Sequence, residues 1–239
     1  MLADLDERFR AAVQSFWDAR QRQLEKQVTA GKIDAGTRGA VTGGTQMGAL
    51  EVLLTDILVD AGLDTKYIHA RTAVELPGYY RPEKQWDLIV VADGKLLVAV
   101  ELKSQVGPSF GNNFNNRAEE AIGNAEDIWT AYRQGLLGVC QAPFLGYFFL
   151  LEDCNAVHAP LRARQPYFPV DPVFERSSYA KRYELLFTRL LLERKFTAAC
   201  LTLAPENELE VGFPALSLSF PQFAVALDAH ARLSAQSLR

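Results

Sequence analysis

Two strand-like apolar runs on either side of an Asp-Gly pair constrain this chain more than any other feature. The runs cover residues 88–92 and 96–100, and an Asp-Gly pair between them is a strong signal for a β-hairpin. Asp87 precedes the first run, and Glu101 and Lys103 follow the second. Charges at the ends of core strands are costly unless they bind an ion or each other, so this pattern predicts a metal-dependent active site. An ordinary hairpin with solvated charges at its ends is the alternative.

The length of the hairpin loop decides whether Asp87 and Glu101 meet. Side chains alternate between the two faces of a strand, so Glu101 and Lys103 share a face. A two-residue loop would pair Asp87 with Val100 and turn Asp87 to the opposite face. A three-residue loop would pair Asp87 with Ala99 and leave it a diagonal neighbour of Glu101 on the same face. We therefore predict an odd-length loop or a β-bulge in this hairpin.

The order of the predicted elements favours an α/β fold with a mixed central β-sheet flanked by helices. Apolar periodicity predicts helices over about residues 3–27, 46–61, 117–134, 177–194 and 222–235. Besides the hairpin, strands are predicted near residues 72–76, 144–151 and 197–203.

The length suits a single domain over residues 1–239. We expect an N-terminal helical part of about 1–65, a catalytic core of about 70–205 and a C-terminal helix of about 221–236.

Composition excludes several classes of protein. The longest apolar run, near residues 144–151, is far shorter than the roughly 20 residues that span a bilayer. The acidic N-terminus lacks a signal-peptide pattern, so we expect a cytoplasmic protein with no membrane partner. The cysteines form no CxxC pair and the histidines no HExxH pattern, so no zinc site is indicated. A net charge of −4 argues against a protein that coats nucleic acid non-specifically.

The charged residues of the hairpin suit a magnesium site. Mg²⁺ prefers one or two carboxylates together with water and phosphate oxygens, so Asp87 and Glu101 are the predicted ligands, with the backbone carbonyl of Leu102 beside them. Lys103 can orient an attacking water and stabilise negative charge in a transition state. Glu51 is a further candidate catalytic residue, because it lies inside an almost wholly apolar helix. The alternatives for Glu51 are an exposed helix position or a pair with a core arginine.

Asp87 followed by Glu101-Leu102-Lys103 resembles the PD-(D/E)xK nuclease superfamily, with Trp86 in place of the proline. A wider stretch resembles the XhoI-type restriction endonuclease family, through residues 76–81, 86–88 and 101–117. The resemblance implies a restriction-endonuclease-like core and a type II restriction enzyme that uses Mg²⁺. It also implies a homodimer that cuts double-stranded DNA at CTCGAG and leaves 5′ overhangs, in a bacterial or archaeal host that carries a cognate DNA methyltransferase.

Polar residues after the hairpin are the predicted DNA contacts, because asparagine can bond adenine and arginine can bond guanine. We expect residues 105–116 to form a loop. The DNA contacts would come from the loop residues Asn112, Asn113, Asn115 and Asn116 and from Arg117, where the next helix begins. A flexible polar loop with a helix N-cap at Asn115 or Asn116 is the alternative for the asparagines. Phosphate contacts are expected from Arg162, Arg164, Arg176, Ser177 and Ser178, with solvated surface as their alternative.

Two other functions are compatible with the same residues. One is a repair or structure-selective nuclease on the same core. The other is a non-catalytic DNA-binding protein, although the intact set of Asp87, Glu101 and Lys103 argues against it. A palindromic site would require a twofold dimer, since each half-site presents the same base edges to one protomer.

Overall fold

A mixed β-sheet forms the centre of the computed structural model, which describes residues 4–29, 46–138, 141–206 and 210–238. Within these residues, five strands pair in the order β1-β4-β5-β6-β7. The pairs β1–β4 and β4–β5 are antiparallel, whereas β5–β6 and β6–β7 are parallel, so the predicted mixed sheet is confirmed. The strands are β1 (Ile68–Ala70), β4 (Leu88–Ala92), β5 (Lys95–Gln105), β6 (Phe144–Glu152) and β7 (Ala198–Ala204).

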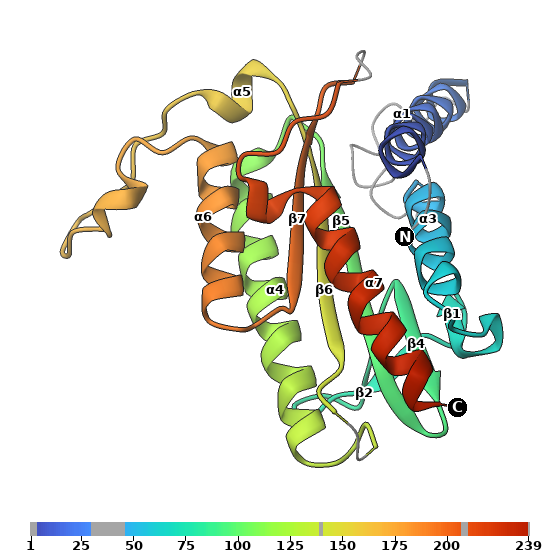
Figure 1. Cartoon of the computed structure of the whole chain (residues 1–239). Helices are drawn as coiled ribbons and strands as arrows, with labels where there is room; N and C mark the ends of the chain where they lie inside the picture. Colours follow the sequence, from blue (N-terminus) through green and yellow to red (C-terminus); the bar gives the residue numbers. More distant parts are fainter. Residues whose placement is uncertain (1–3, 30–45, 139–140, 207–209, 239) are drawn as a thin grey trace.

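Helices cover both faces of this sheet (Figure 1). On one face lie α1 (Leu5–Thr29), α3 (Gly48–Asp60) and α7 (Phe220–Ser237), which share a core with residues such as Val90 and Phe148. On the other face lie α4 (Phe110–Arg133) and α6 (Tyr179–Leu192), which share a second core with residues such as Ala99 and Phe149. The fold is therefore the α/β class expected of a restriction-endonuclease-like core. No described helix is both long and apolar enough to cross a membrane.

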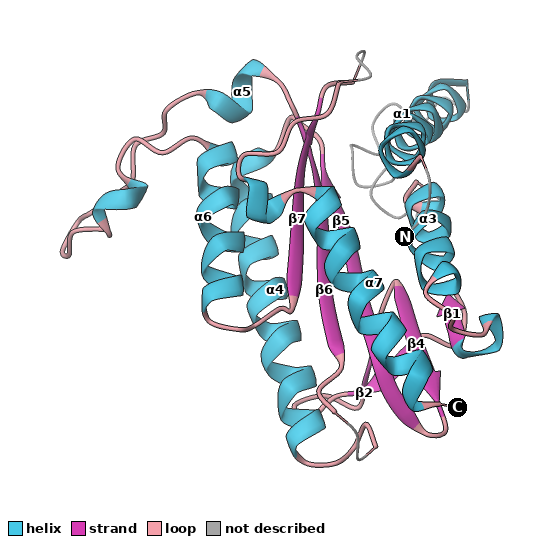
Figure 2. Cartoon of the chain, viewed as in Figure 1, coloured by secondary structure: helices cyan, strands magenta, loops and turns pink. Residues whose placement is uncertain are grey.

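Helix α4 begins earlier than the sequence predicts. We expected residues 105–116 to be a loop, but the helix starts at Phe110 and Ser109 occupies its N-cap (Figure 2). Phe110 is buried, and the ring of Phe114, one turn further on, packs edge-on against Tyr183 at 5.0 Å. This packing of two aromatic side chains on one helix face outweighs the low helix propensity of the asparagines between and after them. The predicted loop is therefore wrong over residues 110–116, and the alternative of an N-cap at Asn115 or Asn116 is wrong as well.

A small second sheet lies beside the hairpin. We expected one strand near residues 72–76, but β2 (Glu75–Pro77) pairs with β3 (Glu83–Gln85), and β1 was not predicted at all. The chain between β2 and β3 is held by Asp127 of α4, which accepts hydrogen bonds from the backbone N–H groups of Tyr79 (2.7 Å) and Tyr80 (2.9 Å) and from Arg81 Nε (2.7 Å). This anchor fixes the short hairpin against the main body. Four shorter elements complete the described chain: η2 (Thr65–Tyr67), α5 (Asn155–His158), η3 (Pro172–Phe174) and η4 (Leu216–Leu218).

Replacement of Asp127 by asparagine should weaken this anchor in a pH-dependent way. Burial raises the pKa of Asp127, but the hydrogen bonds from Tyr80, Arg81 and Tyr79 outweigh it, so the pKa lies below its ordinary value of 3.8. The stabilisation is therefore fully present above pH 3.8 and is lost as the pH falls through the lower folded value. We expect Asp127→Asn to lower the free energy of unfolding by about 1–3 kcal/mol at pH 7.

Urea unfolding at pH 7 and at pH 3 measures this loss, and the difference between wild type and variant should shrink in acid. Asp18→Asn on the exposed side of α1 is the matched control, since its carboxylate accepts only a local bond from Gln14. A difference that is the same at both pH values would contradict the role of the charge.

Candidate active site

The turn of the β4–β5 hairpin contains two residues, and a bulge corrects its register. Asp93 and Gly94 have φ values of 51° and 70°, the left-handed pair of a type I′ turn. The pairing then shifts between Val90 and Val91, where β5 carries one extra residue. The prediction of an odd-length loop or a bulge is confirmed by this bulge.

The bulge brings the two acidic residues onto one face. Leu88 pairs with Val100 after the shift, so the next position along places Asp87 opposite Glu101. This differs from the diagonal arrangement that a three-residue loop would have produced. Residues opposite each other in antiparallel strands share a face, and Lys103 follows on that face two residues after Glu101. All three side chains point toward the α4 side of the sheet, which is also the side of Ala99.

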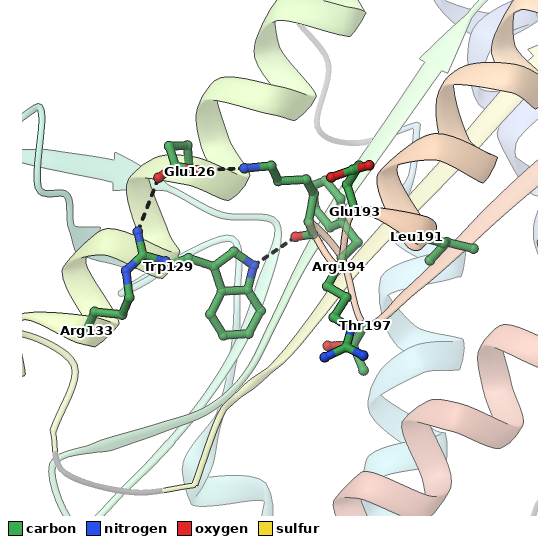
Figure 3. Close-up of a pocket in the computed structure, with 9 residues that line it drawn as sticks. Glu126, Trp129, Arg133, Leu191, Glu193, Arg194 and Thr197 are labelled. Atoms are coloured by element: carbon green, nitrogen blue, oxygen red, sulfur yellow. Dashed lines mark hydrogen bonds and ion pairs between the residues drawn. The ribbon is translucent and has the colours of Figure 1, made fainter.

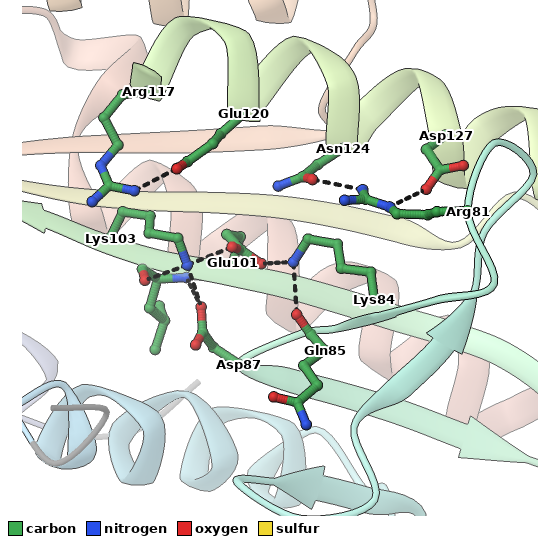
Figure 4. Close-up of polar contacts among 11 residues, drawn as sticks. Arg81, Lys84, Gln85, Asp87, Glu101, Lys103, Arg117, Glu120, Asn124 and Asp127 are labelled. Atoms are coloured by element: carbon green, nitrogen blue, oxygen red, sulfur yellow. Dashed lines mark hydrogen bonds and ion pairs between the residues drawn. The ribbon is translucent and has the colours of Figure 1, made fainter. Parts of the chain in front are cut away.

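Asp87, Glu101 and Lys103 form one connected cluster (Figure 4). Asp87 Oδ2 accepts hydrogen bonds from the backbone N–H of Leu102 at 2.7 Å and from Lys103 Nζ at 3.3 Å. Lys103 also forms an ion pair with Glu101 Oε1. The Glu101 side chain is only 4% exposed, whereas those of Asp87 and Lys103 are 32% and 24% exposed. The cluster thus opens to solvent on the side of Asp87 and Lys103.

A second lysine completes the cluster, and sequence reasoning missed it. Lys84 Nζ lies 2.6 Å from Glu101 Oε2, and its side chain is 12% exposed. The ammonium also lies 4.2 Å from the ring centre of Trp86. Lys84 stands in a polar run between Glu83 and Gln85, which carries no local signal of burial. Only the folding of β3 against the main sheet brings it to Glu101.

Burial and mutual charge set the protonation of these groups. Burial raises the pKa of Asp87, and the charge of Glu101 raises it further. Burial lowers the pKa of Lys103, but the carboxylates of Glu101 and Asp87 outweigh this effect and raise it overall. Burial lowers the pKa of Lys84, against the opposing effect of Glu101. The cluster therefore contains two carboxylates and two ammonium groups in a partly dehydrated space.

The donor set fits a magnesium ion better than a metal that needs a protein cage. Among the residues that the structure describes, no group of three or more histidine, cysteine, aspartate and glutamate side chains comes together. Mg²⁺ keeps several waters and takes one or two carboxylates, together with substrate phosphates. Asp87 and Glu101 would supply these two carboxylates, and the cluster is open to solvent on the side of Asp87 and Lys103.

Comparisons with known proteins show the family to which the chain belongs. The family model for restriction endonuclease XhoI matches residues 26–215. The chain belongs to this restriction endonuclease family. Curated relatives include the type II restriction enzyme BstVI of Geobacillus stearothermophilus, which is 47% identical over 179 residues, covering 73% of this chain and 80% of that enzyme. The type II restriction enzyme XhoI of Xanthomonas vasicola is 46% identical over 194 residues, covering 80% and 77%.

A third relative, the type II restriction enzyme AbrI of Azospirillum brasilense, is 45% identical over 168 residues, covering 70% of this chain and 75% of AbrI. No solved structure matches the chain significantly. The resemblance proposed from the sequence, and the class of type II restriction enzymes, are thereby confirmed.

Glu51 lies close to this XhoI-family cluster but has its own partner. It is 5% exposed in α3 and accepts a hydrogen bond from Arg71 Nε at 2.6 Å. This is the arginine pair that the sequence left open, although the Arg71 side chain is 57% exposed rather than in the core. Burial raises the pKa of Glu51, and the charge of Asp87 contributes to the same shift. Glu51 therefore stands within the electrostatic reach of Asp87.

Arg117 lies on a helix as predicted, but inside α4 rather than at its start, and above the cluster. Its side chain is 17% exposed and forms an ion pair with Glu120 on the next turn of the helix (Figure 4). The charges of Glu101, Arg117 and Glu120 all act on the pKa of the buried Tyr147, which burial raises well above its ordinary value. Arg117 thus stands near Tyr147 of β6, the register partner of Glu101, and its Nη1 is engaged by Glu120.

The other residues predicted to contact DNA differ in their exposure to solvent. Asn112, Asn115 and Asn116 are exposed in the first turns of α4, and Asn113 is half-buried. Arg162, Arg164 and Arg176 are exposed in the long connection before α6. Ser177 is buried, with its hydroxyl donating to Phe174 O at 2.8 Å, and Ser178 caps α6 by accepting from Lys181 N at 3.2 Å. The hydroxyl groups of both serines thus already form hydrogen bonds within the protein.

A pocket of about 500 Å³ lies away from this site, between α4 and the turn from α6 to β7 (Figure 3). Glu126 pairs there with Lys195 at 2.6 Å and with Arg133 at 3.2 Å. Trp129 Nε1 donates to the backbone carbonyl of Lys195 at 2.9 Å. These side chains satisfy one another and tie α4 to the α6–β7 turn, which is a structural role.

Proposed function

We propose that this protein hydrolyses phosphodiester bonds in double-stranded DNA at the palindrome CTCGAG, leaves 5′ overhangs, and depends on Mg²⁺. The observation that carries the chemistry is the cluster of Asp87, Glu101 and Lys103 at the solvent-facing end of β4 and β5. The recognition sequence and the overhangs come from the family resemblance, supported by 46% identity to an enzyme named XhoI. Residues 1–239 would act as one nuclease domain.

In this proposal Asp87, Glu101 and the backbone carbonyl of Leu102 hold the magnesium ion. When bound, the ion stabilises negative charge on the reacting phosphate and lowers the pKa of a bound water. Lys103 orients the attacking water and stabilises the charge that develops on the phosphate, since its ammonium lies beside both carboxylates. Glu51 acts from further away, through its charge near Asp87.

DNA contacts are proposed on two surfaces. Base contacts come from the start of α4, through Asn112, Asn113, Asn115, Asn116 and Arg117. Phosphate contacts come from Arg162, Arg164 and Arg176, which are exposed in the connection before α6. The protein would act as a homodimer on its twofold site, in the cytoplasm of a host whose cognate methyltransferase protects the same sequence.

Arg117→Ala should weaken binding to the specific site much more than binding to unrelated DNA. One good bidentate contact to a base contributes roughly 1–3 kcal/mol of discrimination. Fluorescence anisotropy with matched specific and unrelated duplexes measures both affinities, and Arg133→Ala at the far end of α4 serves as the control. Equal losses on both duplexes would instead make Arg117 a phosphate contact.

Calcium should support DNA binding without fast cleavage. Ca²⁺ coordinates at longer and less regular distances than Mg²⁺, so it can fill the carboxylate site without the geometry that the reaction needs. Anisotropy in Ca²⁺ should show binding, and cleavage should begin only when Mg²⁺ is added. Rapid cleavage in Ca²⁺ alone would contradict the proposed role of the ion.

Plasmid digestion with purified protein tests the function as a whole. Wild-type protein in Mg²⁺ should give discrete fragments that map to CTCGAG, and chelation by EDTA should stop the reaction. Discrete fragments at another sequence would reject the carried-over site and keep the enzyme class. Cleavage only at ends, flaps or damage would favour a structure-selective nuclease, and DNA binding without any cleavage would favour a non-catalytic protein.

A further inference from the structure

Glu101 is shared between two ammonium groups, and only one belongs to the nuclease motif. Lys103 pairs with Oε1, and Lys84 lies 2.6 Å from Oε2. With 4% of its side chain exposed, Glu101 has little contact with water to compensate for its charge. Both oxygens of this carboxylate therefore have a cationic partner inside the protein.

Lys84 is held in place by more than its ion pair. Its ammonium donates to the backbone carbonyl of Gln85 at 2.7 Å and lies over the ring of Trp86, which is 3% exposed. Lys84 also pairs in register with Leu76 across the β2–β3 hairpin. The loop of that hairpin is anchored by Asp127, as described above. The position of the ammonium is thus built into the fold and is not a chance arrangement of a surface side chain.

The charges of the cluster balance before any metal binds. Asp87 and Glu101 contribute two negative charges, and Lys84 and Lys103 contribute two positive ones. A divalent cation that enters this space finds a neutral site, and its attraction to the carboxylates is opposed by both ammonium groups. A DNA phosphate placed beside the cluster would add negative charge, which would offset the repulsion between the ion and the two ammonium groups.

We propose that Lys84 is a positioning residue that makes metal binding by Asp87 and Glu101 depend on bound DNA. It acts through Glu101, which it neutralises while the protein is free. The ion then binds tightly only when the phosphate of the substrate supplies compensating charge. This inference rests on the proposed magnesium site and adds a coupling between metal and DNA to it.

Mn²⁺ binding to the free, full-length protein tests the proposal, measured by the loss of the electron paramagnetic resonance signal of the aqueous ion. Lys84→Met should bind Mn²⁺ about tenfold more tightly than wild type, or better, because one opposing charge is removed. Lys84→Arg keeps the charge and should restore weak binding. Lys66→Met, at an exposed lysine that pairs with Asp64, should leave the affinity unchanged.

DNA affinity provides a second readout, because coupling between two ligands is reciprocal. If DNA strengthens metal binding, then Ca²⁺ must strengthen DNA binding by the same factor. The gain in DNA affinity on adding Ca²⁺, measured by anisotropy, should be about tenfold smaller in Lys84→Met than in wild type. A merely structural role of Lys84 would not change this gain selectively.

Two results would overturn the proposal. The first is an Mn²⁺ affinity of Lys84→Met that equals or falls below that of wild type. The second is tighter binding that survives a further Asp87→Asn change, since the ion would then lie elsewhere. If no variant binds Mn²⁺ with or without DNA, the proposed metal site fails and this inference fails with it. Circular dichroism checks folding, and Lys84→Gln replaces the methionine variant if that variant does not fold.

Discussion

The Lys103→Ala variant should lose nearly all DNA cleavage while it binds DNA about as well as wild type. Lys103 Nζ lies 3.3 Å from Asp87 Oδ2 and pairs with Glu101, so its charge sits where the reacting phosphate would meet both carboxylates. Removal of one group that stabilises developing charge typically lowers a rate by about 10²–10³-fold. The single-turnover cleavage rate in saturating Mg²⁺ measures the loss, and anisotropy measures DNA binding.

Lys66→Ala is the matched control for this experiment, because Lys66 is exposed and pairs only locally with Asp64. It should cleave at the wild-type rate. Undiminished cleavage by Lys103→Ala would remove Lys103 from the active site. A loss of DNA binding as large as the loss of rate would make it a binding residue instead.

Phe149→Ala should cause the largest loss of stability from a single side chain near the site. Phe149 of β6 is fully buried, and its ring lies 4.5 Å from that of Tyr183 and 5.6 Å from that of Phe187. Phe149 is the register partner of Lys103, so its ring packs α6 against β6 at the position next to the site. Truncation of a buried phenylalanine leaves a cavity and costs about 3–5 kcal/mol.

Guanidinium unfolding measures this loss as a lower midpoint at an unchanged slope. Val225→Ala on α7 is the control, since Val225 is 46% exposed and its truncation should change the free energy of unfolding by less than about 0.5 kcal/mol. A loss below about 1 kcal/mol for Phe149→Ala would mean that the α6 side of the core rearranges to fill the space.

Local sequence patterns predicted the elements that depend on near neighbours. The strands of the hairpin, the strands β6 and β7, and four of the long helices follow from runs and periodicities that a short window contains. The acidic pair also follows from local geometry, because a turn type and a bulge decide which residues of two adjacent strands share a face.

Long-range packing decided what the sequence misplaced. The start of α4 depends on Phe110 and Phe114 meeting α6, more than 60 residues further along the chain. The ion pair between Asp127 and Arg81 depends on a loop that docks on α4 from 46 residues away. Neither contact produces a signal in the composition or periodicity of the segments that form it. A short sequence window therefore could not predict it.

The sequence by itself determined the hairpin, its two carboxylates and Lys103, because residues within 17 positions of one another form that unit. It also determined the family, through the residues around that hairpin. Only the tertiary structure decided that Lys84 shares Glu101 and that Glu51 pairs with Arg71. The physical reason is that an ion pair depends on the distance between charges in space, and that distance is set by how separate elements pack.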